Sequence, residues 1–321
     1  MEFLIGNSLH AVLKKGFDHA AYHRSNLSVF DMLLSFSALL HASSLYRQLR
    51  QTKFNYYKMK KFIPLLLAFA IASCKKEVFN AELTESFSIE SSFSNASYPI
   101  KVALPENYNP ETQTYATIYV LDGEDNFDFV AENCKKISTE LSTTNMVVVS
   151  IGYGNDREDD YTPSKATEGG GGAEKFMQFI EHELIPKIES EYAVDTLRSS
   201  RIILGHSFGG LFAAYAFAKH NAVFGNYIML SPSIWYDNEI MLKLEQENRN
   251  INSNNQQLVY LGLGQLENQG RMLAPFEAFY QRLQNNYDYM VIQRHLEPHL
   301  DHMDSKNPNI LEGLNFYFKF R

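Results

Sequence analysis

The sequence predicts an α/β fold with a mostly parallel central sheet of about eight strands flanked by helices. From Ile118 onward, strand-like and helix-like patterns alternate, which is typical of right-handed crossovers between parallel strands. The later strand-like runs are rich in β-branched and aliphatic residues on both faces, as a sheet covered by helices requires. A Gly-x-Ser-x-Gly motif follows the fifth of these runs.

The predicted strands can be placed in chain order. The first two have no helix-like segment between them, which indicates a leading hairpin. In order, the runs are 86–92, 98–105, 115–123, 145–152, 201–206, 226–231, 257–264 and 288–296. We therefore expect one folded domain over residues 85–321, preceded by a polar tether over 74–84.

The first 74 residues differ from the rest of the chain. Residues 59–73 contain two lysines and a short apolar stretch, and Ile71, Ala72 and Ser73 precede Cys74. This pattern is typical of a secretion signal, and its ending resembles the lipobox of bacterial lipoproteins, in which the cysteine is lipidated. We expect a lipid anchor on Cys74 and an extracytoplasmic location, facing the periplasm or at the cell surface of the outer membrane.

A signal peptide belongs at the true start of a protein. We therefore expect translation to begin at Met59 and residues 1–58 to be an extension of the gene model, the alternative being a genuine or disordered N-terminal region. Detection of a peptide from 1–58 in the native protein would contradict this expectation.

Composition excludes some functions. The 321 residues are 45% hydrophobic and carry a net charge of −8, which suits a globular domain with a sizeable core. No segment supplies the clustered basic surface that nucleic-acid binding needs, so no nucleic-acid partner is expected. The second cysteine, Cys134, has no partner once Cys74 is acylated, and we interpret it as a small apolar filler.

The Gly-x-Ser-x-Gly motif is centred on Ser207, between an apolar strand-like run and a helix-like segment. This is the context of a nucleophile elbow, in which Gly205 and Gly209 relieve crowding and the serine hydroxyl projects from the sheet edge. Together with the strand count, the elbow fits an α/β-hydrolase. The helix that follows would point its amides at a developing oxyanion. The alternative interpretation is a glycine-rich turn without chemistry.

A serine hydroxyl needs a positioned base, and in this fold the chain order is serine, acid, histidine. Glu267 is the first acidic residue after the run 257–264 and is the predicted acid; Glu277 is the next candidate, and an ordinary solvated carboxylate remains the alternative for Glu267. His302 is the predicted base because it lies just before the terminal helix. Two other histidines follow the acid, His295 and His299.

Histidines near two aspartates also suggest a metal site. Metal binding is disfavoured because Pro298 interrupts any helix that would align His295 with His299. We expect no metal and no cofactor, since a serine esterase needs neither.

Two backbone donors are expected to hold the oxyanion. One is the amide of Phe208, directly after the nucleophile, and the other should come from the loop near Gly123 and Glu124. A simple strand-ending turn is the alternative for this loop. His206 points away from Ser207 and cannot serve as the base; we expect it to pack or hydrogen-bond beneath the elbow, and it is a candidate substrate-binding residue.

Several segments together resemble the bacterial "Putative esterase" family of α/β-hydrolases, which includes siderophore (enterobactin) esterases and esterase D. The resemblance covers about residues 86–320 and rests on shared landmarks at 119–123, 157–163, 203–215, 231–235, 264–268 and 301–305. It implies a serine hydrolase with Ser207 as nucleophile, His302 as base and Glu267 as acid. It also implies that Trp235 is an aromatic wall of the substrate cleft and that Arg157 lies in the loop that forms the mouth of the site.

These observations predict a lipid-anchored serine esterase acting on a small-molecule or oligosaccharide ester. The lipobox departs from siderophore esterases, so acetylated or feruloylated carbohydrate is an alternative substrate. Acyl transfer by the same fold is a second alternative, and a non-enzymatic surface binding lipoprotein is a third.

Overall fold

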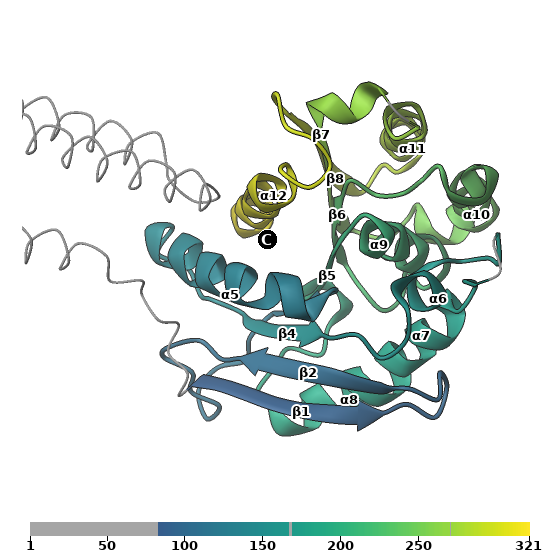
Figure 1. Ribbon diagram of the computed structural model, residues 1–321. Helices are drawn as coiled ribbons and strands as arrows, with labels where there is room; N and C mark the ends of the chain where they lie inside the picture. Colours follow the sequence, from purple (N-terminus) through teal and green to yellow (C-terminus); the bar gives the residue numbers. More distant parts are fainter. Residues whose placement is uncertain (1–82, 167–168, 270) are drawn as a thin grey trace, which may run out of the picture. The chain divides into compact units, whose positions relative to one another are not determined.

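Figure 1 shows the computed structural model of the protein, which describes residues 83–321 apart from 167–168 and 270. The predictions for residues 1–58, for the signal segment 59–73 and for Cys74 lie outside the described residues. The first strand begins at Thr84, one residue before the predicted start of the folded domain.

Eight strands form one sheet in the order β1-β2-β4-β3-β5-β6-β7-β8. β1 pairs antiparallel with β2, and β2 pairs antiparallel with β4; every later pairing is parallel. The predicted α/β fold with a leading hairpin is thus confirmed. The strands span Thr84–Glu90 (β1), Ser97–Ala103 (β2), Thr117–Val120 (β3), Val147–Ile151 (β4), Arg201–His206 (β5), Asn226–Leu230 (β6), Gln257–Gly264 (β7) and Met290–Glu297 (β8).

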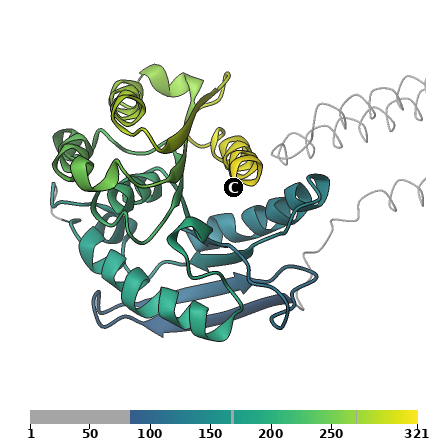
Figure 2. The same cartoon turned by 180° about the vertical axis from the view of Figure 1, so that it is seen from behind.

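Helices connect the parallel strands and cover both faces of the sheet (Figures 1 and 2). The longer ones are Gly123–Glu140 (α5), Phe208–Lys219 (α9), Tyr236–Asn252 (α10), Leu273–Asn286 (α11) and Lys306–Phe320 (α12). The shorter ones are Arg157–Tyr161 (α6), Ala173–Phe179 (α7), Ile185–Glu191 (α8) and the 3₁₀ turns Arg198–Ser200 (η3) and Gln265–Gln269 (η4). A π-helical turn, Ile180–Leu184 (η2), joins α7 to α8 where Pro186 interrupts regular helix bonding.

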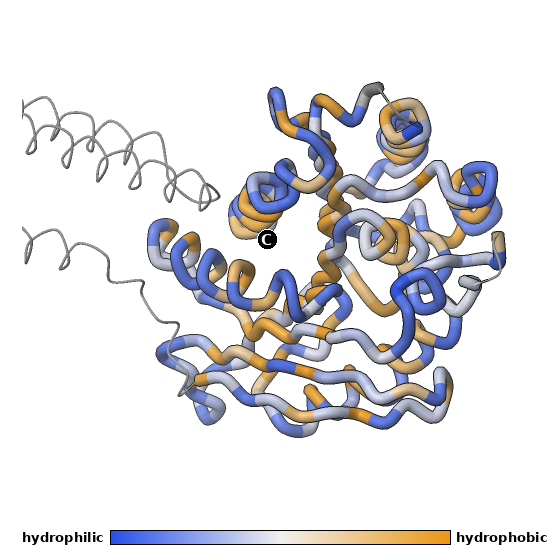
Figure 3. The backbone as a smooth tube through the Cα atoms, in the orientation of Figure 1, coloured by the Kyte–Doolittle hydropathy of each residue, from blue (hydrophilic) through white to orange (hydrophobic). Residues whose placement is uncertain are grey.

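Alternate residues of the central strands point into two separate cores. Ile203 belongs to the core beneath α7 to α11, whereas its neighbours Ile202 and Leu204 belong to the core beneath α5 and α12. Figure 3 shows hydrophobic residues gathered along these strands. Because both faces are buried, the strands read as continuous apolar runs in the sequence.

Cys134 lies on α5 in the second core and is fully buried. Burial raises the pKa of its thiol, which fits an inert apolar filler.

Of the helices in the described part of the chain, none is long and apolar enough to cross a membrane.

Candidate active site

Ser207 lies on a sharp turn between β5 and α9. Its backbone has φ 60° and ψ −117°, a conformation that a non-glycine residue adopts only when its surroundings enforce it. The flanking glycine makes the turn possible, because a Cβ on Gly205 would lie 2.2 Å from the carbonyl oxygen of Gly209. The Ser207 amide donates to the Leu230 carbonyl at 2.9 Å, which ties the turn to β6. The local geometry is that of a nucleophile elbow.

Three side chains from separate segments converge at this turn. Nε2 of His302, in the loop between β8 and α12, lies 3.0 Å from Oγ of Ser207. Nδ1 of the same ring lies 2.6 Å from Oε2 of Glu267, which is part of η4 after β7. The structure thus joins the three predicted side chains in one hydrogen-bonded chain.

The carboxylate of Glu267 is buried and held by further donors. Its Oε1 accepts from Oγ of Ser231 and from the amide of Gly264, each at 2.7 Å. Burial raises the pKa of Glu267, but the hydrogen bonds from His302, Ser231 and Gly264 outweigh it and leave the pKa below its ordinary value. Glu267 is therefore ionised at neutral pH and holds the proton of His302 on Nδ1.

Sequence reasoning missed Ser231. It lies just after β6 with φ 40°, and its side chain is almost fully buried beside the acid. The sequence signal that bears on Ser231 is its place at the start of the segment 231–235, which resembles the family.

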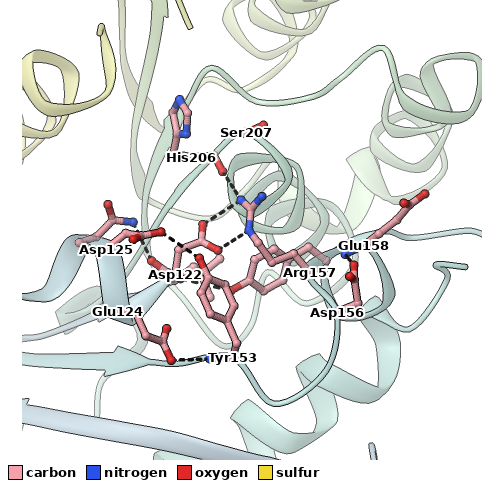
Figure 4. A network of polar contacts seen from close by, with 12 residues as sticks. Asp122, Glu124, Asp125, Tyr153, Asp156, Arg157, Glu158, His206 and Ser207 are labelled. Atoms are coloured by element: carbon pink, nitrogen blue, oxygen red, sulfur yellow. Dashed lines mark hydrogen bonds and ion pairs between the residues drawn. The ribbon is translucent and has the colours of Figure 1, made fainter. Parts of the chain in front are cut away.

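A second polar group lies behind the elbow (Figure 4). Arg157 donates through Nε and Nη2 to the two carboxylate oxygens of Asp122, at 2.6 and 3.0 Å, and through Nη2 to the carbonyl of His206 at 3.4 Å. Asp122 is buried between β3 and α5 with φ 53°. Arg157 therefore braces the loop after β3 against the elbow.

Two cavities open at the nucleophile, and Ser207 and His302 line both. The larger, about 390 Å³, is also lined by Trp235, Leu266, Arg271 and Met272. The guanidinium of Arg271 stacks 3.2 Å above the Trp235 ring. The smaller, about 120 Å³, has Asp122, Tyr153, Arg157, His206 and Lys306 among its lining residues. Trp235, Arg157 and His206 thus each border a cavity at Ser207.

The structure does not bring Gly123 and Glu124 to either cavity. A Cβ on Gly123 would lie 2.9 Å from Oγ of Ser150, so this glycine serves the close packing of α5 on β4. The Glu124 carboxylate accepts from the Tyr153 amide at 2.9 Å. Asp122, directly before α5, and Asp125 and Asn126, in the first turn of α5, line the smaller cavity. Phe208 begins α9 directly after the nucleophile, as expected for an oxyanion donor.

The remaining candidates have other partners. Glu277 lies on α11 and pairs with Arg294, and Nε2 of His295 on β8 lies 3.1 Å from Oε1 of Glu297. The amide of His299 donates to Oε1 of Gln265, and His299 is not among the residues that line the two cavities. Within residues 83–321, as far as they are described, no cluster of three His, Cys, Asp or Glu side chains could hold a metal ion.

Comparison with known proteins places this geometry in context. A family model described as "Putative esterase" matches residues 91–306. The ferri-bacillibactin esterase BesA of Bacillus subtilis is 31% identical over 225 residues, which cover 62% of this chain and 77% of that protein. Further curated relatives are matched over 46% to 61% of their own length.

Two solved structures share the fold. The BES protein of Bacillus cereus superposes with a TM-score of 0.67 at 28% identity, over 76% of this chain and 98% of that one. An IroE-like serine hydrolase of Shewanella oneidensis superposes with a TM-score of 0.65 at 27% identity, over 74% of this chain and 80% of that one.

An eight-stranded α/β sheet with a serine at its elbow defines an α/β-hydrolase, and BesA, one of the relatives, is named as an esterase. The chain belongs to the Esterase family and is a carboxylic-ester hydrolase similar to siderophore esterases.

Proposed function

We propose that this esterase acts through an acyl-enzyme on Ser207, with His302 as general base and Glu267 as the acid that orients it. The hydrogen-bonded chain from Ser207 through His302 to Glu267 is the observation that carries the proposal. The elbow supports it as well, because it exposes the hydroxyl at the start of a helix.

The reaction proceeds in two halves. Nε2 of His302 removes the proton of Ser207 as Oγ attacks the ester carbonyl, and the resulting imidazolium then protonates the departing alcohol. Water attacks the acyl-enzyme with the same base, and collapse of the second tetrahedral intermediate releases the carboxylic acid and restores the Ser207 hydroxyl. Glu267 keeps the ring in the required tautomer and stabilises the imidazolium without taking a proton.

The amide of Phe208 is the proposed donor to the oxyanion, and such a donor typically lowers the barrier by about 3 kcal/mol. The predicted second donor, at Gly123 or Glu124, has no support from the residues that line the cavities and stays a prediction.

We propose a siderophore-like ester as the substrate. The name of BesA, a ferri-bacillibactin esterase, supports this choice. The larger cavity supports it too, because its volume is within the range of small-molecule sites and Trp235 offers an aromatic face beside the cation of Arg271. Screening one enzyme preparation against a ferric catecholate lactone and against acetylated and feruloylated oligosaccharides tests this choice. Preference for the carbohydrate esters would overturn it.

We further propose that the mature enzyme is anchored by a lipid on Cys74, outside the cytoplasm. The lipobox-like sequence before this cysteine is the support. Metabolic labelling with an alkyne fatty acid should modify the full-length protein, and Cys74→Ala should abolish the label. An unchanged label in that variant would contradict the anchor.

The proposed roles are tested by comparing histidine variants on p-nitrophenyl butyrate. His302→Ala should lower kcat by roughly a thousandfold or more. His295→Ala and His299→Ala are matched controls from the same stretch of chain and should keep kcat within a few-fold of wild type. Equal losses in all three variants would contradict the assignment of the base.

A further inference from the structure

The side chain of His206 makes two contacts that the roles of Glu267 and His302 do not account for. Its side chain is only 5% exposed. Its Nε2 lies 2.9 Å from the main-chain carbonyl oxygen of His302. The two imidazole rings also pack together, with their centroids 4.6 Å apart. The residue before the nucleophile is thus bonded to the backbone of the proposed base.

The direction of this bond follows from chemistry. A carbonyl oxygen only accepts, so Nε2 of His206 must carry the proton and Nδ1 must be bare. Burial, assisted by the neighbouring charge of His302, lowers the pKa of His206 to about 3. The ring is therefore neutral at assay pH, and it adds no charge that would oppose the imidazolium formed on His302 during the reaction.

The backbone of His206 is fixed as well. Its carbonyl accepts from Arg157, whose guanidinium is bound to Asp122. Glu267 restrains the ring of His302, whereas His206 restrains the main chain that carries this ring. Each restraint controls a different degree of freedom of the base.

We propose that His206 is a positioning residue, which holds the main chain of His302 in the position from which Nε2 of His302 reaches Ser207. The inference rests on the proposed function, since it requires His302 to be the base. His206 itself exchanges no proton and touches no reacting atom. Misplacement of a catalytic group by about 1 Å can cost roughly a hundredfold in rate, so one lost backbone tie can matter.

The experiment compares His206→Phe with His206→Gln. Phenylalanine keeps a ring but removes the donor, whereas glutamine can offer an amide N–H near the former Nε2. We expect His206→Phe to lower kcat roughly ten- to hundredfold with KM within about twofold, and His206→Gln to recover most of the loss. His220→Phe is the matched control, because this histidine also hydrogen-bonds through Nε2 but lies at the far end of α9.

A substrate contact would behave differently. If His206 bound substrate, His206→Phe would raise KM and leave kcat unchanged, which overturns the inference; so does wild-type kcat in His206→Phe. Should His206→Phe fold poorly, the phosphonylation rate constant of the folded fraction with a fluorophosphonate gives the same comparison without depending on yield.

A double-variant cycle separates this inference from the proposed function. If His206 acts through His302, the His206→Phe change should have no effect on the residual rate of His302→Ala. An equal loss in both backgrounds overturns the positioning role. Wild-type activity of His302→Ala alone would overturn the proposed function, whereas an inactive His302→Ala with a fully active His206→Phe would overturn only the positioning role.

Discussion

Oε2 of Glu267 lies 2.6 Å from Nδ1 of His302, although the two residues belong to loops that follow different strands. The parallel register of β7 and β8 brings these loops to the same edge of the sheet. The elbow after β5 lies at this edge too, because parallel strands share their carboxyl ends. Sheet topology therefore assembles the site from three distant parts of the chain.

Replacing the acid should disable the base without removing it. Glu267→Gln should lower kcat by roughly a thousand- to ten-thousandfold, because the amide can stabilise the wrong tautomer of His302. Glu277→Gln is the matched control and should stay near wild type, since Glu277 pairs with Arg294 on a different surface. Steady-state kinetics on p-nitrophenyl butyrate measure both; equal activity of both variants would contradict the role of Glu267.

Ser231 should matter for stability as well as for rate. Ser231→Ala leaves one buried oxygen of Glu267 short of a donor, which should lower the free energy of unfolding by about 1–3 kcal/mol. Urea denaturation measures this change. Ser305→Ala is the control, because the buried Ser305 hydroxyl has no hydrogen-bond partner among the residues that the structure describes; a loss as large in Ser305→Ala would refute the explanation.

Acid should destabilise the fold through His206. The pKa of His206 is lowered to about 3 in the folded protein, whereas an unfolded histidine has a pKa of about 6.5. The contribution of neutral His206 to the free energy of unfolding is therefore complete above about pH 6.5. It is lost as the pH falls toward the pKa of His206 in the folded protein, by up to about 1.4 kcal/mol per pH unit. Urea denaturation at pH 7 and pH 5 should show a smaller drop for His206→Gln than for wild type. Identical drops would argue against a buried neutral His206.

The pair of Arg157 with Asp122 should resist a conservative exchange. Arg157→Lys keeps the charge but cannot bind both carboxylate oxygens, so the free energy of unfolding should fall by about 1–3 kcal/mol. The arginine is about one-third exposed, so solvent screening limits this loss. Adding Asp122→Asn to Arg157→Lys should lower the free energy of unfolding little further, because the buried carboxylate that lysine binds incompletely is then absent. Full additivity in thermal or urea denaturation would contradict direct coupling.

Local sequence patterns predicted most of the fold and the main catalytic candidates. Alternation of strands and helices gave the parallel sheet, and the elbow motif placed Ser207, because both depend on short-range periodicity and backbone geometry. Chain order then led to Glu267 and His302, since in this fold the acid and base follow later strands.

Contacts made only in three dimensions were not predictable. Ser231 meets Glu267 across 36 positions of sequence, and His206 meets the carbonyl of His302 across 96. No local pattern records such pairs. Gly123 lies where the second oxyanion donor is predicted, and a Cβ at this position would meet β4. The sequence alone does not show which close contact a glycine permits.

Covalent labelling of the nucleophile tests the central claim most directly. The wild-type enzyme, labelled with a fluorophosphonate and then digested, should yield one modified peptide with the label on Ser207, and Ser207→Ala should bind no label and hydrolyse p-nitrophenyl butyrate only at background rate. A label on another residue, or wild-type hydrolysis by Ser207→Ala, would contradict the account.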